Sequence, residues 1–244
     1  MAGAYRKDLA YIHDAGFGKY ALNAAPVLLD ALRRSRLKRG LVIELGCGSG
    51  ILSEQIAAAG YDVLGIDLST DILTLARQRV PGGTFRAESL LTAELPSCVG
   101  VAAIGECVNY LFDSRSNPQQ LARLFRRVYA ALVPGGWFLF DSSGPGRVPG
   151  GGPLKMHFEG DDWTILVTVD EDKRRQLLTR RITTFRKVGE HYRRDHEIHH
   201  LRLYPPVDLV NSLRRVGFRV RTLRRYGPQP LPPGLVAFAA RKPG

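Results

Sequence analysis

The stretch that most constrains the fold of this chain is LVIELGCGSG, residues 41–50. A short apolar run that carries Glu44 is followed by glycines at every second position, Gly46, Gly48 and Gly50. A second apolar run, residues 61–66, leads to Asp67, seventeen residues after the last of these glycines. Glycine lets the backbone approach a ligand, and a carboxylate can accept both hydroxyls of a ribose. The pattern therefore predicts two parallel strands that form half of a nucleoside-binding site.

The spacing of the glycines excludes two common nucleotide motifs. In the dinucleotide fingerprint GxGxxG the third glycine would fall at Ile51, one residue later than it does here. The turn contains no lysine, so the P-loop pattern GxxxxGK[ST] cannot be written onto it. Glu44 places a negative charge where a pyrophosphate would otherwise lie. A ligand with a cationic amino-acid end suits this position better.

At this point the pattern resembles a known family, the class I S-adenosylmethionine-dependent methyltransferases. ELGCGSG, residues 44–50, is similar to the first motif of that family, and GIDLS, residues 65–69, is similar to the second. The resemblance continues with RAESL at 86–90 after a third strand, AIGE at 103–106 after a fourth, and LVPGG at 132–136 before a fifth. It covers residues 40–142 well and the rest of the chain only by the order of its elements.

Alternating strand and helix signals predict an α/β fold, a doubly wound (Rossmann-like), seven-stranded and mostly parallel sheet. Apolar residues at helical spacing mark helices before the first strand, after the glycine turn, after Asp67 and before residue 133. Ser69 or Thr70 can cap the third of these helices, and Gly60 suits the end of the second. The apolar positions are Leu22, Ala25, Leu29, Leu32; Leu52, Ile56, Ala59; Ile72, Leu75, Ala76; and Leu121, Leu124, Phe125, Val128, Leu132.

We expect one methyltransferase domain over residues 1–244. Its parts are an N-terminal helical lid (1–38), a cofactor-binding core (39–142), an antiparallel β insertion that caps the acceptor (154–204), and a final helix with closing strands (205–244). Residues 142–153 contain five glycines and three prolines and read as a mobile loop. The insertion lies between strand 5 and the last helix, and shows three β-rich runs, 163–169, 177–187 and 191–203. A helix at 207–216 and strands at 218–223 and 235–240 follow.

The resemblance implies S-adenosyl-L-methionine as cofactor and S-adenosyl-L-homocysteine as product. Gly46, Cys47, Gly48 and Gly50 would then contact the amino-acid moiety, and Glu44 would order its ammonium indirectly. Asp67 would hold the ribose, Leu68 would pack on the adenine, and Glu88 or Ser89 would meet its exocyclic amine. The full set of expected cofactor contacts is Tyr11, Glu44, Gly46, Cys47, Gly48, Gly50, Asp67, Leu68, Glu88, Ser89, Leu90 and Glu106.

Catalytic residues follow less directly from the pattern. The methyl donor is already activated, so the protein mainly aligns donor and acceptor and excludes water, and a base is needed only if the acceptor must lose a proton. By the resemblance, Glu106 would lie near the sulfonium, and Tyr110, together with Asn109, would face the methyl group. His13, in a polar-aromatic lid segment, is the first candidate for a base, although a histidine beside an aspartate is more often a capping or solvent residue.

Residues 196–200, HEIHH, match the zinc-protease signature HExxH. That chemistry requires both histidines on one helical face. The flanking residues read as a strand, in which His196, Ile198 and His200 share one face while Glu197 and His199 share the other. We therefore expect no metal site here.

Composition leaves the acceptor class open. The net charge of +12 can indicate nucleic acid, but 28 of the 35 basic residues are arginines scattered through the chain, which a compositional bias explains as well. The [ND]PP[YFW] signature of base amino-group methylation is absent, and Cys107 lacks the Pro-Cys context of cytosine C5 methylation. We expect a small-molecule acceptor (an N, O or C nucleophile), with an RNA or protein methyltransferase as the alternative and a cofactor-binding protein without transfer activity as a third.

Composition also bears on location. Cys47, Cys98 and Cys107 show no pairing or metal spacing, as in the reduced thiols of cytoplasmic proteins. No apolar run approaches the roughly 18 residues of a membrane span, and the N-terminus lacks the apolar core of a signal peptide. We therefore expect a cytoplasmic protein without a membrane partner. The pattern indicates no particular oligomeric state.

Overall fold

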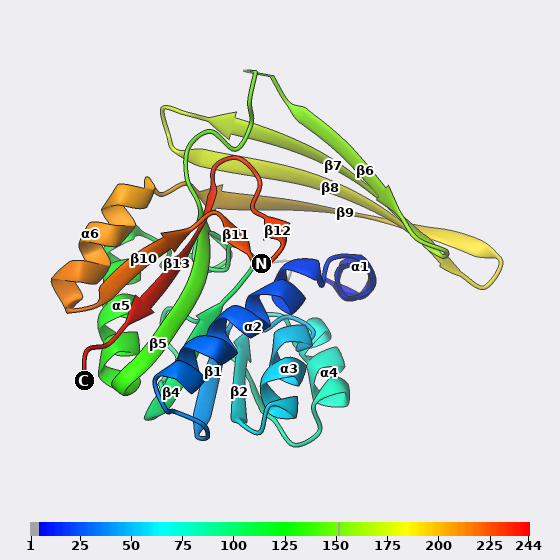
Figure 1. The fold of residues 1–244 in the computed structure, drawn as a ribbon. Helices are drawn as coiled ribbons and strands as arrows, with labels where there is room; N and C mark the ends of the chain where they lie inside the picture. The colour runs from blue at the N-terminus through cyan, green and yellow to red at the C-terminus, as the bar shows by residue number, and fades with distance from the viewer. Residues whose placement is uncertain (1–4, 151) are drawn as a thin grey trace.

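The centre of the molecule is a twisted seven-stranded sheet with helices on both faces (Figure 1). The computed structural model describes residues 5–150 and 152–244, so residues 1–4 of the expected lid and residue 151 of the expected loop lie outside the described part. In spatial order the strands are β10 (Arg219–Leu223), β13 (Leu235–Arg241), β5 (Leu132–Ser143), β4 (Cys98–Ala103), β1 (Leu41–Leu45), β2 (Asp62–Asp67) and β3 (Thr84–Ala87). Only β13 runs antiparallel to its neighbours, β5 and β10. The predicted doubly wound, mostly parallel fold is confirmed.

The helices bury the sheet between two apolar layers. Successive strand residues point to opposite faces, so Val42 packs in the core beneath α2 and α3, while Ile43 packs in the core beneath α5 and α6. The helices are α1 (Lys7–Gly16), α2 (Lys19–Arg34), α3 (Ile51–Ala58), α4 (Thr70–Arg79), α5 (Pro118–Ala131) and α6 (Pro206–Val216). All four helices predicted from apolar spacing up to residue 132 are present, and the Ser69 hydroxyl accepts the Ile72 N–H as the predicted cap of α4.

Two residues of the predicted apolar stripes lie elsewhere. Leu22 is 48% exposed, because it falls on the outer side of α2. Leu132 is buried, but it is the first residue of β5 and not the last of α5. An apolar residue that ends a helix and begins a strand suits either period, so the spacing alone could not place that boundary.

The insertion between β5 and α6 is an antiparallel sheet of four strands that arches over the N-terminal helices (Figure 1). The predicted runs form β7 (Trp163–Asp172), β8 (Leu177–Val188) and β9 (His191–Arg202). The sequence missed β6 (Leu154–Glu159), a mostly exposed edge strand without clear alternation, and the short hairpin β11 (Arg225–Tyr226) and β12 (Gln229–Pro230). Ser142 and Ser143, expected in the loop, extend β5.

The N-terminal segment packs against the inner face of the inserted sheet. Leu9 and Ile12 of α1 share an apolar cluster with Ile165, Ile182 and other residues of β7 to β9. A Cβ at Gly16 would lie 2.8 Å from the indole of Trp163, so the end of α1 fits closely against β7. The first helix therefore lies between the core and the insertion.

Two expectations from composition can be compared with the structure. Among residues 5–150 and 152–244, no helix is both long and apolar enough to cross a membrane. Cys47, Cys98 and Cys107 are free thiols.

Substitution of Gly50 tests the tightness of the glycine turn. Gly50 has a φ of 79°, and a Cβ there would lie 3.1 Å from the Cα of Ala76 in α4. Gly50→Ala should lower the free energy of unfolding in urea by at least about 1 kcal/mol, because a left-handed backbone disfavours a side chain. Gly82→Ala, where the added Cβ meets open space, should change it by less than about 0.5 kcal/mol. Equal effects would show that the turn tolerates a side chain.

Candidate functional site

The glycine turn after β1 is shaped by left-handed backbone and by contacts with β2. Gly46, Gly48 and Gly50 have φ values of 69°, 53° and 79°. The N–H groups of Gly46 and Cys47 donate to the carbonyl of Ile66 at 2.7 and 3.1 Å. A Cβ at Gly46 would lie 2.5 Å from the Sγ of Cys107, so the turn has no room for a side chain there. The turn is thus held against the end of β2.

Asp67 lies at the end of β2, directly beside this turn. Its two carboxylate oxygens accept the N–H groups of Gly48 at 3.0 Å and Ser69 at 2.9 Å. Burial raises the pKa of Asp67, and these backbone hydrogen bonds oppose that shift. Each carboxylate oxygen can accept a further hydrogen bond, so the group can still take two hydroxyls. The neighbouring Leu68 is 47% exposed and is free to pack on a ring.

Glu44 lies buried behind the turn. The Ser53 hydroxyl donates to its Oε2 at 2.5 Å. Burial raises the pKa of Glu44 to about 8, although the Ser53 hydrogen bond acts in the opposite direction. Burial thus favours the protonated form of this carboxyl group, and a nearby ammonium would favour its ionisation.

The loop that follows β3 contacts the loop that precedes α5. Ser89 is buried and its hydroxyl donates to the carboxylate of Asp113, whereas Glu88 is half-buried and its N–H donates to the carbonyl of Asp67. The Arg115 guanidinium binds Asp113 and lowers its pKa to about 2. Leu90 is half-buried and packs at the margin of the main core. Ser89 and Asp113 therefore present a hydrogen-bonding edge beside Asp67, and the sequence did not single out Asp113.

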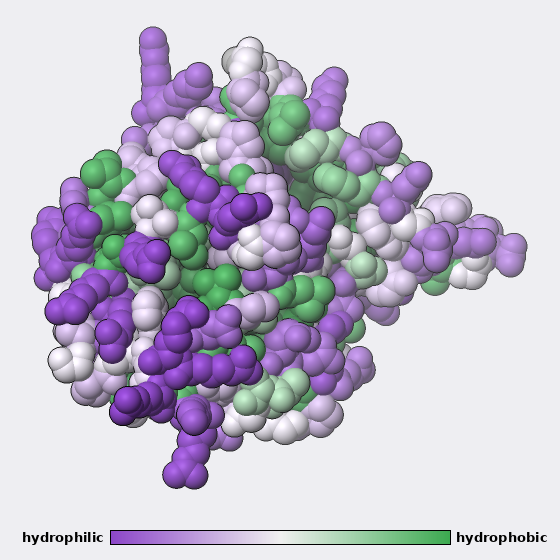
Figure 2. Space-filling view, viewed as in Figure 1, coloured by the Kyte–Doolittle hydropathy of each residue, from purple (hydrophilic) through white to green (hydrophobic). Residues whose placement is uncertain are grey.

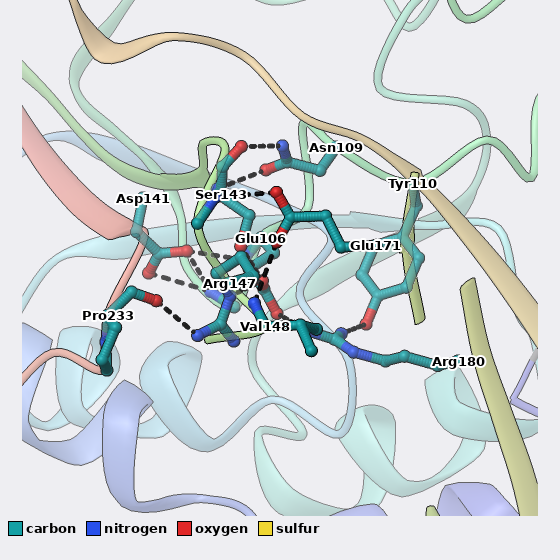
Figure 3. Close-up of polar contacts among 12 residues, drawn as sticks. Glu106, Asn109, Tyr110, Asp141, Ser143, Arg147, Val148, Glu171, Arg180 and Pro233 are labelled. Atoms are coloured by element: carbon teal, nitrogen blue, oxygen red, sulfur yellow. Dashed lines mark hydrogen bonds and ion pairs between the residues drawn. The ribbon is translucent and has the colours of Figure 1, made fainter. Parts of the chain in front are cut away.

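Glu106 lies in a buried ion-pair network beyond the end of β4 (Figure 3). Its Oε2 accepts from Arg180 of β8 at 2.6 Å, its Oε1 lies 3.5 Å from the Nε of Arg147, and the hydroxyl of Ser143 donates to Oε1. Burial alone would raise the pKa of Glu106, but the two arginines outweigh it and lower the pKa to about 2. The carboxylate is therefore ionised at any working pH.

Two further carboxylates hold the backbone around Glu106. Asp141 accepts the N–H groups of Gly105 and Glu106 and the hydroxyl of Tyr226, and burial raises its pKa to about 6. Glu171 accepts the N–H groups at positions 146 and 148 at 2.8 and 2.9 Å, which directs Arg147 toward Glu106 (Figure 3). Glu106 itself adopts a φ of 64°, uncommon for a residue with a side chain.

Tyr110 connects this network to a group of half-buried and buried rings. The Arg180 guanidinium donates to the Tyr110 hydroxyl at 3.1 Å, and that hydroxyl lies 2.9 Å from the hydroxyl of Tyr5. We call Tyr5, His13, Tyr110, Phe112 and His199 the aromatic cluster; neighbouring ring centroids in it lie 4.7 to 6.2 Å apart. The cluster unites the N-terminal segment, the loop after β4 and strand β9.

The N-terminal segment also reaches the cofactor edge of the core. The backbone carbonyl of Tyr5 accepts from the Ser69 hydroxyl at 3.0 Å, two residues beyond Asp67. On the other side, the N–H groups of Tyr5 and Arg6 donate to the carboxylate of Glu197 in β9. The segment therefore bridges the end of β2 and the inserted sheet.

The remaining lid residues predicted from the sequence lie in different surroundings. His13 is buried in the aromatic cluster, and burial lowers its pKa to about 4. Tyr11 lines a hollow between α1 and the turn from β6 to β7, where its hydroxyl donates to Asp162 at 2.9 Å and the Arg186 guanidinium lies 3.6 Å from its ring centroid. Asn109 does not face the acceptor side with Tyr110, because its amide binds the backbone of Ser143 and Arg202.

The HEIHH segment forms part of β9, as the flanking pattern predicted. His196, Ile198 and His200 are exposed on one face, and Glu197 and His199 are buried on the other. Residues four apart in a strand are about 13 Å apart, which is too far for His196 and His200 to bind one ion. Across residues 5–150 and 152–244, no group of three or more histidine, cysteine, aspartate or glutamate side chains is placed to hold a metal.

Several residues of this site were not predicted from the sequence. They are Tyr5, Phe112, Arg147, Arg180, Glu197 and His199. Arg147 and Arg180 were not singled out because the scattered arginines were attributed to a compositional bias. The alternation of β9 did place Glu197 and His199 together on one face, which was the available signal for their burial.

The ion pairs of Glu106 can be tested through stability. Glu106→Gln should lower the free energy of unfolding at pH 7 by about 3 kcal/mol, because it leaves two arginines buried without a counter-charge. A pKa lowered from 4.5 to about 2 contributes stability above pH 4.5 that is lost as the pH falls toward 2, so the difference between wild type and variant should shrink over that range. Asp172→Asn, which breaks an exposed pair with Arg175, should cost less than about 1 kcal/mol. A pH-independent difference would contradict the role of this charge.

The comparisons with known proteins agree with this geometry. A family model described as "Methyltransferase domain" matches residues 42–136. A ubiquinone biosynthesis O-methyltransferase from Hydrogenovibrio crunogenus is 32% identical over 125 residues, which is 48% of this chain and 48% of that protein; the chain thus matches about half the length of this relative.

Two solved structures share the fold over nearly the whole chain. A S-adenosylmethionine-dependent methyltransferase from Clostridium acetobutylicum has a TM-score of 0.81 at 19% identity, covering 96% of this chain and 98% of its own. CalS10, an amino pentose methyltransferase from Micromonospora echinaspora with bound S-adenosylmethionine, has a TM-score of 0.77 at 18% identity, covering 99% of both chains. With the glycine turn, Asp67 and the strand order, these findings show that residues 42–136 match a methyltransferase domain and that the chain has the fold of the S-adenosylmethionine-dependent methyltransferases.

Proposed function

We propose that this enzyme transfers the methyl group of S-adenosylmethionine to a metabolite-sized acceptor held beneath the inserted sheet. The observation that carries the proposal is the enclosure of the aromatic cluster. Tyr5 from the N-terminal segment, Tyr110 from the core and His199 from the insertion meet there through hydroxyl and ring contacts, next to the Glu106 network. A buried site lined by rings and a few polar groups suits a small molecule better than a polymer.

The cofactor would lie along the edge formed by the glycine turn and β2. Gly46, Cys47, Gly48 and Gly50 would contact its amino-acid moiety, with Glu44 behind them. Asp67 would accept the ribose hydroxyls through the lone pairs that the backbone leaves free. Leu68 and Leu90 would pack on the adenine, with Ser89 or Glu88 at its amine. Tyr11 would act on the cofactor through α1, which it fixes to the inserted sheet.

Methyl transfer would then proceed by in-line displacement. A lone pair of the acceptor attacks the methyl carbon while the carbon–sulfur bond breaks toward sulfur. The protein's main task is to align the two and to keep water away. Glu106, near the sulfonium, and Tyr110, near the acceptor, are the residues from the core in position for this task, and His13 is the sequence-based candidate for a base.

The names of similar proteins support a small acceptor. The matched relative is a ubiquinone biosynthesis O-methyltransferase, and the matched structure is an amino pentose methyltransferase. Both names describe small molecules, although one acceptor atom is oxygen and the other acceptor is an amino sugar. An oxygen or nitrogen nucleophile is therefore the acceptor class that we favour.

An RNA acceptor is the second candidate because of the net charge of +12. On the visible face, hydrophilic residues are spread over both the core and the inserted sheet (Figure 2). Several arginines are paired with carboxylates of the protein itself, including Arg79 with Asp14, Arg180 with Glu106 and the partly exposed Arg193 with Asp8. Both observations favour a compositional origin of the charge over a footprint for phosphates.

Replacement of Asp67 tests the cofactor position. Asp67→Ala should weaken binding of S-adenosylhomocysteine by one to two orders of magnitude in calorimetry, because unpaired ribose hydroxyls in a closed site cost roughly 1.5–3 kcal/mol. Asp71→Ala, an exposed carboxylate in the first turn of α4, is the matched control and should bind as wild type does. Unchanged affinity of the Asp67 variant would remove this residue from the cofactor site.

A methyl-transfer assay with radiolabelled S-adenosylmethionine tests the acceptor class. With a metabolite extract and total RNA offered separately, we expect label in the metabolite fraction, with a rate that varies little between 50 and 200 mM salt. An enzyme that neutralised several RNA phosphates would instead lose affinity steeply over such a range, since each contact releases counterions. Salt-sensitive labelling of RNA alone would favour the second candidate, and no transfer to either would favour a binding protein.

A further inference from the structure

The inner face of β9 carries a histidine held by a carboxylate. The Nε2 of His199 lies 2.8 Å from the Oε2 of Glu197, and both side chains are buried. An ionised carboxylate oxygen accepts hydrogen bonds and cannot donate them, so Nε2 must carry the proton of this bond. In a neutral ring the other nitrogen, Nδ1, then bears a free lone pair.

Glu197 is fixed by the N-terminal segment. The Tyr5 N–H donates to Oε2 at 2.9 Å and the Arg6 N–H to Oε1 at 2.8 Å, with the Nε of Arg6 3.8 Å from Oε1. These contacts fix the position of the Glu197 carboxylate beside His199. The orientation of His199 therefore depends on the closed position of the N-terminal segment.

The free nitrogen of His199 belongs to a ring that lies within the aromatic cluster. Nδ1 is buried and has no hydrogen-bond partner among the described residues 5–150 and 152–244. The ring lies edge-on to Phe112 at 4.9 Å and to Tyr110 at 5.8 Å, and tilted against Tyr5 at 5.1 Å. A buried polar atom without a partner is uncommon in folded proteins and is often found where a ligand supplies the missing bond.

We propose that His199, oriented by Glu197, is the general base of methyl transfer. This inference rests on the proposed function. As the acceptor's lone pair bonds to the methyl carbon and the carbon–sulfur pair moves to sulfur, the acceptor's O–H or N–H proton passes to Nδ1. The products are the methylated acceptor, S-adenosylhomocysteine and an imidazolium that the Glu197 carboxylate stabilises, as in other carboxylate–histidine pairs. Glu197 is thus a positioning residue.

His13, the candidate from the sequence, shares the cluster but differs in its partners. Its ring stacks on Phe17 at 6.1 Å and meets Tyr5 edge-on at 5.2 Å, and no carboxylate of the described residues is hydrogen-bonded to it. Burial lowers the pKa of His13 to about 4, which makes it a weak proton acceptor at neutral pH. Of these two histidines, only His199 has a carboxylate that orients its ring.

The tautomer of His199 can be measured on the intact protein without any acceptor. Long-range proton–nitrogen NMR distinguishes Nδ1–H from Nε2–H rings, and the His199→Asn spectrum identifies which of the six histidine signals belongs to residue 199. We expect a ring whose Nε2 carries a proton fixed by Glu197. A neutral ring with its proton on Nδ1 would overturn the proposal, whatever the acceptor proves to be.

The test is completed by measuring kcat for methyl transfer to the acceptor that the transfer assay identifies. His199→Asn should lower kcat by about 10²- to 10⁴-fold, while S-adenosylhomocysteine affinity stays within about threefold. His13→Asn should lower kcat by less than tenfold. His200→Asn is the matched control, since this neighbour on the exposed face of β9 contacts Thr179 and should leave kcat unchanged.

The pH profile separates catalysis from a structural role. The groups that face His199 are Glu197 on its own strand, Tyr5 and Arg6 of the N-terminal segment, His13 of α1, and Tyr110 of the loop after β4. The acid limb of the wild-type rate should disappear in His199→Asn and shift in Glu197→Gln. If His199→Asn melts early, the shift in Glu197→Gln decides.

The outcomes distinguish the two proposals. Transfer to a metabolite by His199→Asn at the wild-type rate and with the wild-type pH profile would refute the base and leave the proposed function intact. Absence of metabolite transfer by the wild type, with the Nε2–H ring observed, would instead refute the proposed function.

Discussion

An ionised carboxylate can remain buried only where cations and hydrogen bonds compensate it. Glu106, beyond the end of β4, has Arg180 from the inserted sheet, Arg147 from the loop after β5, and the hydroxyl of Ser143. Both arginines lie later in the chain than the strands that form the cofactor edge. That edge is therefore electrostatically complete only when the insertion has folded back over it, and the position of the second sheet follows from charge compensation as well as from apolar packing.

A second set of charges fixes the N-terminal segment to the same sheet. Asp8 pairs with Arg193 and Arg186, which lower its pKa, and Arg6 pairs with Asp195. The arginines in these pairs are partly exposed, and pairs of that kind are individually weak in water. The same segment binds Glu197, which in turn binds His199, so the N-terminal segment and the inner face of β9 are held together by one chain of contacts.

The structure shows that several arginines of this chain bind groups of the protein itself. Most of the 35 basic residues are arginines, and composition alone suggests a surface for nucleic acid. Arg180 and Arg147 are nevertheless committed to a buried carboxylate, and Arg127 donates to the backbone carbonyls of residues 90 and 91. A guanidinium can serve several oxygens at once, so arginine can tie loops and sheets together where lysine would make a single point contact.

Local patterns in the sequence were sufficient to predict the fold of the core. The glycine turn, the position of Asp67 beside it, most of the apolar positions of α2 to α5 and the alternation of β9 each depend on a few residues, and the structure contains all of these elements. The edge strand β6 was missed because its exposed residues carry no period, and the end of α5 was misplaced because Leu132 suits a helix and a strand equally. The contacts of Tyr5, Arg147, Arg180 and His199 join residues far apart in the chain. Only the packing of the N-terminal segment, the loop after β5 and the insertion onto the core decides such contacts, because no local pattern records which distant side chains will be neighbours.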